Sequence, residues 1–252
     1  MNKIVLVTGA TSGFGEASAR RFAREGYDCI LSGRRGDRLK GLAASLEKQD
    51  GVRVLPIVLD VRDRAKVLEE IGCLPESWQA IDVLVNNAGL ALGRDFFDEA
   101  SLDDWDTMID TNVKGLLYVA RAVLPYMIRR NQGHIINLGS TAAKEVYEKG
   151  NAYCGSKFAV DALSRAMRID LLRHRIKVTA IHPGAAETEF SMVRFKGDAN
   201  QAAQVYSGYK PLSAQDVADV IYYTTTLPPH VCINDLVLTC LGQADAMYTY
   251  KG

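Results

Sequence analysis

The sequence predicts a doubly wound α/β fold with a mostly parallel sheet, and two observations carry this prediction. Short β-branched runs alternate with longer helical patterns along the whole chain. The runs are almost continuously apolar, as strands are when helices cover both faces of their sheet and right-handed crossovers join neighbouring strands. Seven strands are predicted, at residues 4–7, 29–32, 52–59, 81–85, 133–138, 177–181 and 235–239.

Length and composition predict a single domain over residues 1–252. The chain has 48% hydrophobic and 24% charged side chains, so it can bury a full core. No linker or shift in composition divides it. The 30 basic and 30 acidic residues give a net charge of zero. This balance disfavours a nucleic acid or an anionic membrane as the main partner.

Apolar runs and cysteines indicate a compartment. No stretch approaches the roughly 20 apolar residues of a membrane span, and the first apolar run, at residues 4–7, is too short for a signal peptide. The five cysteines lack C-x-x-C spacing, and the four histidines lack metal-ligand spacing. We therefore expect a cytoplasmic protein with no disulfide framework and no metal site.

The first predicted strand runs into a glycine-rich turn that precedes a helical pattern. Glycines let the backbone approach a pyrophosphate, and a helix N-terminus offers unpaired N–H groups and the positive end of a dipole. An ordinary strand-to-helix turn is the alternative, but the position on the first strand of a βαβ unit favours a dinucleotide. The expected contacts are Gly9, Thr11, Ser12, Gly13, Phe14 and Gly15.

Arg34 and Arg35 follow the second strand, where folds specific for NAD carry an acid for the ribose hydroxyl. Two guanidinium groups can instead pair with a 2′-phosphate, which an acid would repel. The alternative is a solvated basic start to the next helix. The pattern favours NADP as the cofactor.

Polar residues also follow the third and fourth strands. Asp60, next to Val61, is placed to accept a hydrogen bond from the adenine amino group. Asn87 is the expected cofactor contact after the fourth strand, and the neighbouring Asn86 is either a second contact or a tie between strands.

The chemistry concentrates at Ser140, Tyr153 and Lys157. Ser140 follows the fifth strand, and Tyr153 and Lys157 lie four residues apart on one face of a predicted helix. A phenol is a poor base at neutral pH, but a nearby ammonium and an oxidised nicotinamide both favour the phenolate. Ser140 can hold a substrate oxygen beside Tyr153, and Asn112 can order a water chain to Lys157.

Together, the glycine turn, Asn86–Gly89, Asn112, Ser140, the Tyr153–Lys157 pair and Pro183-Gly184 resemble the short-chain dehydrogenase/reductase family over nearly the whole chain. The resemblance implies a Rossmann-type fold, with Tyr153 as general acid and base. It also implies that Lys157 binds the nicotinamide ribose and lowers the pKa of Tyr153. Pro183, Gly184 and Thr188 would contact the cofactor. A homotetramer would form through the helices around residues 104–130 and 152–173.

The segments GRRGDRL, VNNAGLALG, GHIINLGSTAA and residues 188–198 are similar to those of NADP-dependent 3-hydroxy acid dehydrogenases. Such enzymes oxidise serine, allo-threonine and 3-hydroxypropionate-type compounds and reduce malonic semialdehyde. The polar segment at about residues 187–210 is placed as a substrate lid would be. Its Arg194 is the expected carboxylate partner, since a guanidinium binds a carboxylate through two hydrogen bonds. Arg194 and Lys196 as solvated lid charges are the alternative.

Two other functions compete with the oxidation of a small hydroxy acid. The enzyme could reduce a bulkier carbonyl compound, such as a steroid, a sugar or an acyl-carrier ketone. The charged lid argues against this, because a lipid substrate favours an apolar one. The same fold could serve a non-catalytic NADP-sensing protein. The intact set of Ser140, Tyr153 and Lys157 argues against a sensor, which needs no proton donor.

Overall fold

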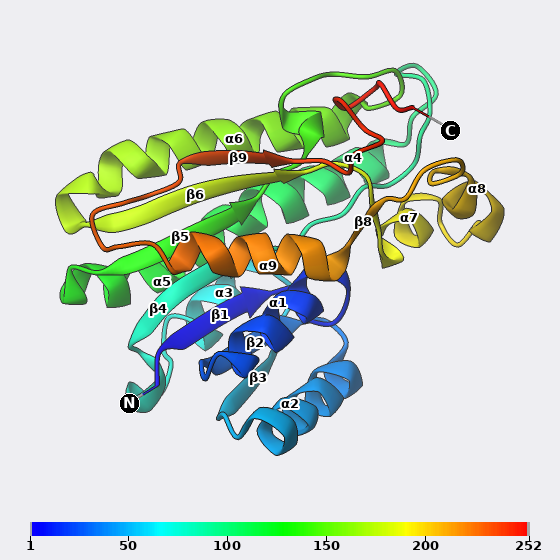
Figure 1. Ribbon diagram of the computed structural model, residues 1–252. Coiled ribbons are helices and arrows are strands. Elements are labelled where there is room, and N and C mark those ends of the chain that lie inside the picture. The colour runs from blue at the N-terminus through cyan, green and yellow to red at the C-terminus, as the bar shows by residue number, and fades with distance from the viewer. Residues whose placement is uncertain (1, 251–252) are drawn as a thin grey trace.

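The computed structural model describes residues 2–250 and contains a seven-stranded parallel sheet in the order β3-β2-β1-β4-β5-β6-β9 (Figure 1). Residues 1, 251 and 252 of the predicted domain 1–252 lie outside the described residues. The strands are β1 Ile4–Thr8, β2 Asp28–Gly33, β3 Val54–Val58, β4 Ile81–Asn86, β5 Gly133–Leu138, β6 Ile176–Pro183 and β9 Asp235–Leu238. The doubly wound fold and its seven predicted strands are confirmed.

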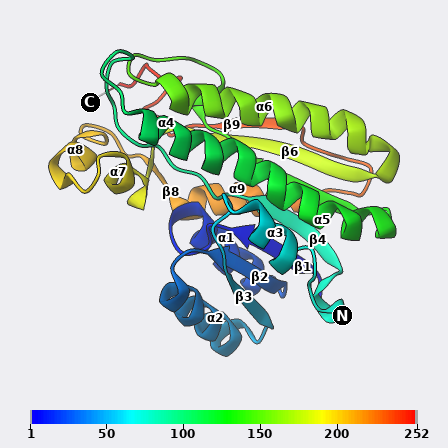
Figure 2. The ribbon, with the colours of Figure 1, turned by 180° about the vertical axis from the view of Figure 1, so that it is seen from behind.

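Helices cover both faces of the sheet. One face carries α1 (Gly13–Arg24), α2 (Gly36–Asp50) and α9 (Ala214–Thr225), which lie in front in Figure 1. The other face, in front in Figure 2, carries α3 (Arg64–Glu70), α5 (Leu116–Arg130) and α6 (Asn151–Leu171). Between α4 (Leu102–Ile109) and α5 lies a π-helical turn, η2 (Asp110–Gly115). Short 3-10 turns are η1 Glu76–Trp78, η3 Thr141–Ala143 and η4 Leu172–His174. Within residues 2–250, no helix is both long and apolar enough to cross a bilayer.

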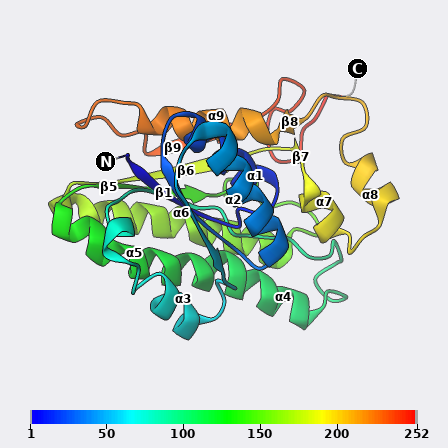
Figure 3. The same cartoon turned by 90° about the horizontal axis from the view of Figure 1, so that it is seen from below.

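The sheet separates two hydrophobic cores. The view from below shows the helices that lie on either side of the sheet (Figure 3). Successive side chains of a strand point to opposite faces. Thus Val5 and Val7 pack under α1, α2 and α9, whereas Ile4 and Leu6 pack under the opposite helices. Every residue of β1 is buried, which explains why the central strands have continuous apolar runs instead of an alternating pattern.

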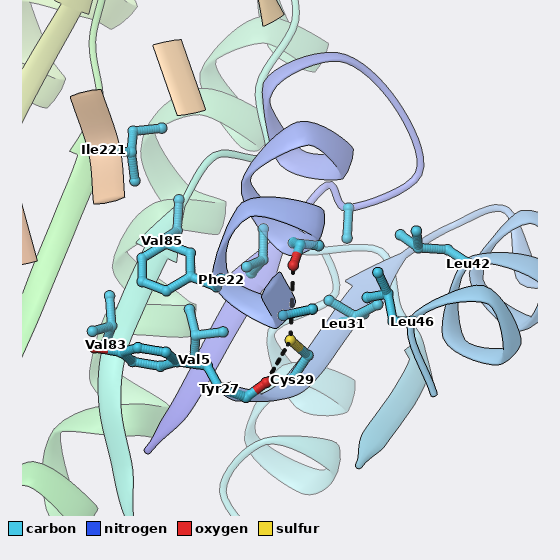
Figure 4. Close-up of a cluster of buried hydrophobic side chains, with 14 of the residues drawn as sticks. Val5, Phe22, Tyr27, Cys29, Leu31, Leu42, Leu46, Val83, Val85 and Ile221 are labelled. Atoms are coloured by element: carbon cyan, nitrogen blue, oxygen red, sulfur yellow. Dashed lines mark hydrogen bonds between the residues drawn. The ribbon is translucent and has the colours of Figure 1, made fainter. Parts of the chain in front are cut away.

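Phe22 of α1 lies at the centre of the core in Figure 4. Its ring makes edge contacts with Tyr27, at 5.0 Å between centroids, and with Tyr222, at 5.4 Å. The sulfur of Cys29 lies within hydrogen-bond distance of two carbonyls, those of Ala19 and Tyr27, as the dashed lines in Figure 4 mark. Burial raises the pKa of this thiol to about 12, so it remains protonated. All five cysteines, which lie within residues 2–250, are free in the structure.

Between β6 and α9 the chain forms small elements that the sequence analysis did not predict. A two-stranded parallel sheet pairs β7 (Ala186–Glu187) with β8 (Leu212–Ser213). Between these strands lie α7 (Glu189–Arg194) and α8 (Ala199–Gln204). This segment contains the lid predicted at about residues 187–210, and Figure 1 shows it beyond the carboxyl end of β6. Its role as a lid stays a prediction.

The turn between β1 and α1 lies very close to the end of β4. The hydroxyl of Thr8 accepts hydrogen bonds from the backbone N–H groups of Asn87 and Ala88, each at 3.0 Å. The side-chain amide of Asn87 in turn donates to the Thr8 carbonyl at 2.8 Å. A Cβ at Gly15 would lie 2.3 Å from the Gly9 carbonyl oxygen, and Gly9 itself has a φ of +65°. Both positions therefore require glycine.

Gly15→Ala tests this close approach. We expect the free energy of unfolding in urea to fall by about 1 to 3 kcal/mol, because the added methyl group forces the turn away from β4. Gly41→Ala is the matched control: Gly41 lies inside α2, and a Cβ added there would meet no atom within 4 Å. Helix propensity should raise the stability of this control by about 0.5 to 1 kcal/mol. Equal effects of the two variants would contradict the tight turn.

Candidate active site

A cavity of about 280 Å³ opens at the carboxyl ends of the central strands. It spans the point where the strand order changes direction, between β1 and β4, which is where open α/β sheets bind their ligands. Its lining runs from the ends of β1 and β2 to α6. The sequence-predicted residues that line it are Gly9, Thr11, Ser12, Gly13, Phe14, Arg34, Arg35, Asp60, Val61, Asn87, Tyr153, Lys157 and Thr188.

The features of this cavity fit a dinucleotide with an extra phosphate. α1 begins at Gly13 in the cavity wall, so its first N–H groups and the positive end of its dipole lie there. Gly89 has no side chain to narrow the cavity, and a Cβ added there would lie 3.2 Å from the side-chain oxygen of Asn112. The guanidinium of Arg34 lines the cavity and has no hydrogen-bond partner among the described residues.

Arg35 is held more firmly than Arg34. Its guanidinium donates to the side-chain hydroxyl of Thr11 at 3.0 Å and to that of Ser12 at 2.7 Å. It also pairs with Glu189 of α7 at 2.8 Å, and Arg38 pairs with the same carboxylate at 2.6 Å. Hydrogen bonds from Arg35 and then Arg38 lower the pKa of Glu189. A phosphate at Arg35 would therefore meet a carboxylate from α7.

Three other residues discussed for the cofactor, Asp60, Asn86 and Gly15, make contacts within the protein itself. Asp60 lines the cavity, but its carboxylate pairs with Arg62 at 2.6 Å. The Arg62 side chain, as the largest cause, lowers the pKa of Asp60. Asn86 donates to Asn137 at 3.0 Å and so ties β4 to β5, which favours the strand-tie interpretation. Gly15 does not line the cavity but supports the turn from behind.

A second cavity, of about 410 Å³, adjoins the first and shares Phe14, Gly139, Tyr153, Thr188 and Phe190 with it. The other predicted residues in its lining are Ser140, Pro183, Gly184 and Arg194. The structure thus places Tyr153 where the two cavities meet. A cofactor in the first cavity and a small substrate in the second would both contact this phenol.

Burial dominates the acidity of Tyr153. It raises the pKa of the phenol well above its usual value, and Tyr147 raises it further, while the hydrogen bond with Ser140 and the charge of Arg194 lower it. In this structure Tyr153 is therefore a protonated phenol, suited to donate a proton. The lowering expected from the resemblance is not the dominant effect here, because the phenol is only 8% exposed.

Lys157 and Asn112 lie behind Tyr153. Burial lowers the pKa of Lys157 to about 8, and its ammonium donates to the Leu138 carbonyl at 2.9 Å. Asn112, in the π-helical turn, exchanges two hydrogen bonds of 2.8 Å with the backbone of Leu90 and donates to Ser156 at 3.0 Å. Its amide is thus committed to protein contacts, and its part in a water chain stays a prediction. Such π-helical turns occur often at functional sites.

Several residues that line or support the two cavities were not predicted from the sequence. Glu189 pairs with the predicted phosphate site, and Tyr147 and Gln243 line the second cavity. His182, which the sequence did not assign to the site, is buried behind Ser140. No local pattern marks these residues, although the position of His182 next to Pro183-Gly184 at a strand end was an available signal.

Lys157→Met should stabilise the protein while it removes activity. At pH 7 the folded chain holds a buried ammonium whose pKa is lowered from 10.5 to about 8, which costs about 3 kcal/mol. Allowing for the lost bond to Leu138, we expect the unfolding free energy to rise by about 1 to 3 kcal/mol at pH 7. Because the unfolded chain binds the proton more tightly, this gain should shrink as the pH rises from about 8 to 10.5.

Urea unfolding at pH 7 and at about pH 9.5 measures this difference. Lys114→Met is the matched control, because the Lys114 side chain is 55% exposed and pairs with Asp110. Its loss should not stabilise the chain. A Lys157→Met variant less stable than the wild type at pH 7 would contradict the expected desolvation cost.

Comparisons with known proteins identify the family of this chain. A family model for short chain dehydrogenases matches residues 3–199. The chain is 49% identical over 244 residues to the NADP-dependent 3-hydroxy acid dehydrogenase YdfG of Salmonella typhi, covering 96% of this chain and 97% of that protein. It is 48% identical to sulfoacetaldehyde reductase 2 of Chromohalobacter salexigens, covering 97% and 96%. The closed form of a serine dehydrogenase complexed with NADP+ is 48% identical, covers 98% of both chains and has a TM-score of 0.91. This chain therefore belongs to the short-chain dehydrogenase family.

Proposed function

We propose that the protein transfers a hydride between NADP and the hydroxyl-bearing carbon of a small 3-hydroxy acid, such as serine, allo-threonine or 3-hydroxypropionate. The observation that carries this proposal is the adjacency of two cavities that meet at Tyr153. One has a glycine turn and Arg34 for a dinucleotide phosphate. The other has Arg194 for an acid. The names of the relatives support the same cofactor and substrate class.

NADP, when bound, supplies the hydride acceptor for oxidation and, in its reduced form, the hydride donor for reduction. The chain supplies the proton chemistry. In reduction, the phenol of Tyr153 donates its proton to the carbonyl oxygen, and in oxidation the phenolate takes it back from the hydroxyl. The hydroxyl of Ser140 holds that oxygen beside Tyr153, and the ammonium of Lys157 stabilises the phenolate.

Arg194 is suited to the carboxylate of the substrate. Its guanidinium lies 5.6 Å from the centroid of the Tyr153 ring and 5.7 Å from that of Tyr147, inside the second cavity. Its Nε atom is buried and has no hydrogen-bond partner among the described residues. A buried N–H without a partner is costly, so a ligand oxygen there gains a full hydrogen bond. This favours a binding role over a solvated lid charge.

Three further properties belong to the proposal. A homotetramer is supported by exposed apolar side chains on the outer helices, with Leu102 at 69%, Ile169 at 76% and Leu172 at 74% exposure. A cytoplasmic location is supported by five free cysteines, three of them buried as thiols. Residues of about 187–210 are proposed as the lid, since α7 contributes to both cavities.

Arg34→Ala tests the cofactor. We expect the KM for NADP to rise about tenfold to a hundredfold, because a charge-assisted bond to the 2′-phosphate is lost, with little change for NAD. The fold should tolerate the change, since Arg34 is exposed. Lys40→Ala removes an exposed positive charge from α2 outside the cavity, and serves as the control. Equal weakening of NADP and NAD by Arg34→Ala would reject the phosphate contact.

Initial rates with NADP test the substrate. We expect turnover of L-serine, L-allo-threonine and 3-hydroxypropionate, and a loss of at least about a hundredfold in Tyr153→Phe, because the proton donor is removed. Arg194→Ala should raise the KM for these acids about tenfold or more. The KM for a neutral secondary alcohol should not change. Lys196→Ala is its control, since Lys196 pairs with Asp104 at 2.8 Å and lines neither cavity.

The same assay separates the competing functions. Reduction of sulfoacetaldehyde in preference to malonic semialdehyde would mean that the substrate carries a sulfonate instead of a carboxylate. Arg194 would then bind the sulfonate. Turnover of a bulky ketone alone would reject the acid substrate. NADP binding without turnover of any compound would favour the non-catalytic sensor.

A further inference from the structure

The ring of His182 lies directly behind the backbone that carries Ser140. His182 is the penultimate residue of β6 and is fully buried. Its ring fills the space beside Gly139, where a Cβ would lie 2.3 Å from Nδ1. Nδ1 lies 3.3 Å from the carbonyl oxygen of Ser140. The ring therefore contacts the backbone at both residues that lead into the substrate cavity.

The other side of the ring faces a cluster of charges. Nε2 of His182 lies 3.4 Å from a carboxylate oxygen of Asp235 and 3.6 Å from one of Asp161. Lys144 bonds to both carboxylates, at 2.6 and 3.2 Å, and Arg165 pairs with Asp161 at 2.7 Å. Two cations balance two anions, and Lys144 already supplies the positive charge between the carboxylates. The cluster thus needs no metal ion.

Only one ring nitrogen has a hydrogen-bond partner among the described residues, namely Nδ1, at 3.3 Å from the Ser140 carbonyl. Nε2 is a buried atom without such a partner among these residues. Burial and the Lys144 ammonium lower the pKa of His182, although Asp235 and Asp161 oppose them. A neutral imidazole carries one N–H. The Ser140 carbonyl is an acceptor, so Nδ1 is the nitrogen that carries the proton.

We propose that His182 is a positioning residue for catalysis, whose Nδ1–H holds the Ser140 carbonyl while the Lys144, Asp161 and Asp235 cluster fixes the ring from behind. The Ser140 hydroxyl accepts a hydrogen bond from the Ala142 N–H at 3.1 Å and forms another with Tyr153. A shift of the Ser140 backbone would therefore move this hydroxyl away from the phenol. This inference rests on the proposed role of Ser140 in binding the substrate oxygen.

Two substitutions separate the two sides of the ring. In His182→Asn the amide lies near the position of Nδ1 and retains a donor for Ser140, whereas in His182→Gln it lies near Nε2 and faces the carboxylates. We expect His182→Gln to lower kcat about tenfold or more, with the KM for NADP unchanged, because Ser140 is misplaced. His182→Asn should keep kcat within about threefold of the wild type. Melting temperatures of both variants report stability separately.

Nitrogen NMR of the wild type, labelled with 15N-histidine, tests the proton position without any substrate. The chain has four histidines, and the His182→Asn spectrum identifies the signal of His182. A protonated Nδ1 supports the proposal, and a bare Nδ1 with a protonated Nε2 overturns it. Equal loss of kcat in both variants, in step with their melting temperatures, also overturns it. A wild type that turns over no hydroxy acid would reject the proposed function, while the NMR result would still decide the hydrogen bond to Ser140.

Discussion

The close approach of the turn after β1 to the end of β4 is the constraint on which the site depends. Without side chains at Gly9 and Gly15, α1 can begin directly over the sheet, and Asn87 can close the gap between the two strands. The N-terminus of α1 then forms the wall of the first cavity. The strand order leaves room for this cavity. From β1 the following strands are added toward β3, and from β4 they are added toward β9, so the connections diverge between β1 and β4.

The same burial that stabilises the fold controls the chemistry of the site. Tyr153 and Lys157 are buried side chains of α6, and burial disfavours the charged form of each. Tyr153 is thus kept as a protonated phenol, and Lys157 loses its proton more easily than an exposed lysine does. Positive charge brought by an oxidised nicotinamide would act strongly on both groups in such surroundings. The buried ammonium of Lys157 lowers the stability of the folded chain, but the protonation of Lys157 and Tyr153 can then respond to the bound ligand.

The segment after β6 connects the two cavities. Thr188 caps α7 and lines both cavities, Glu189 pairs with Arg35 beyond β2, and Lys196 pairs with Asp104 of α4. Arg194 accepts a backbone hydrogen bond from Gly93 and directs its guanidinium toward Tyr153. The segment is thus tied to residues on both sides of the two cavities, beyond β2 and in α4.

The sequence alone determined the seven strands, the glycine turn, and the set of Ser140, Tyr153 and Lys157, because each has a local pattern of apolar residues, glycines or helical spacing. The predicted third strand, at residues 52–59, is longer than β3. Val52 and Leu59 are buried in the core and look like strand residues, but they lie outside the paired residues of β2 and β3. Tertiary structure alone decided the pairing of Glu189 with Arg35, the burial of His182 against Asp161 and Asp235, and the short strands β7 and β8. These contacts join residues far apart in the chain, and a local pattern shows which side chains are buried or charged but not which distant group the fold brings against them.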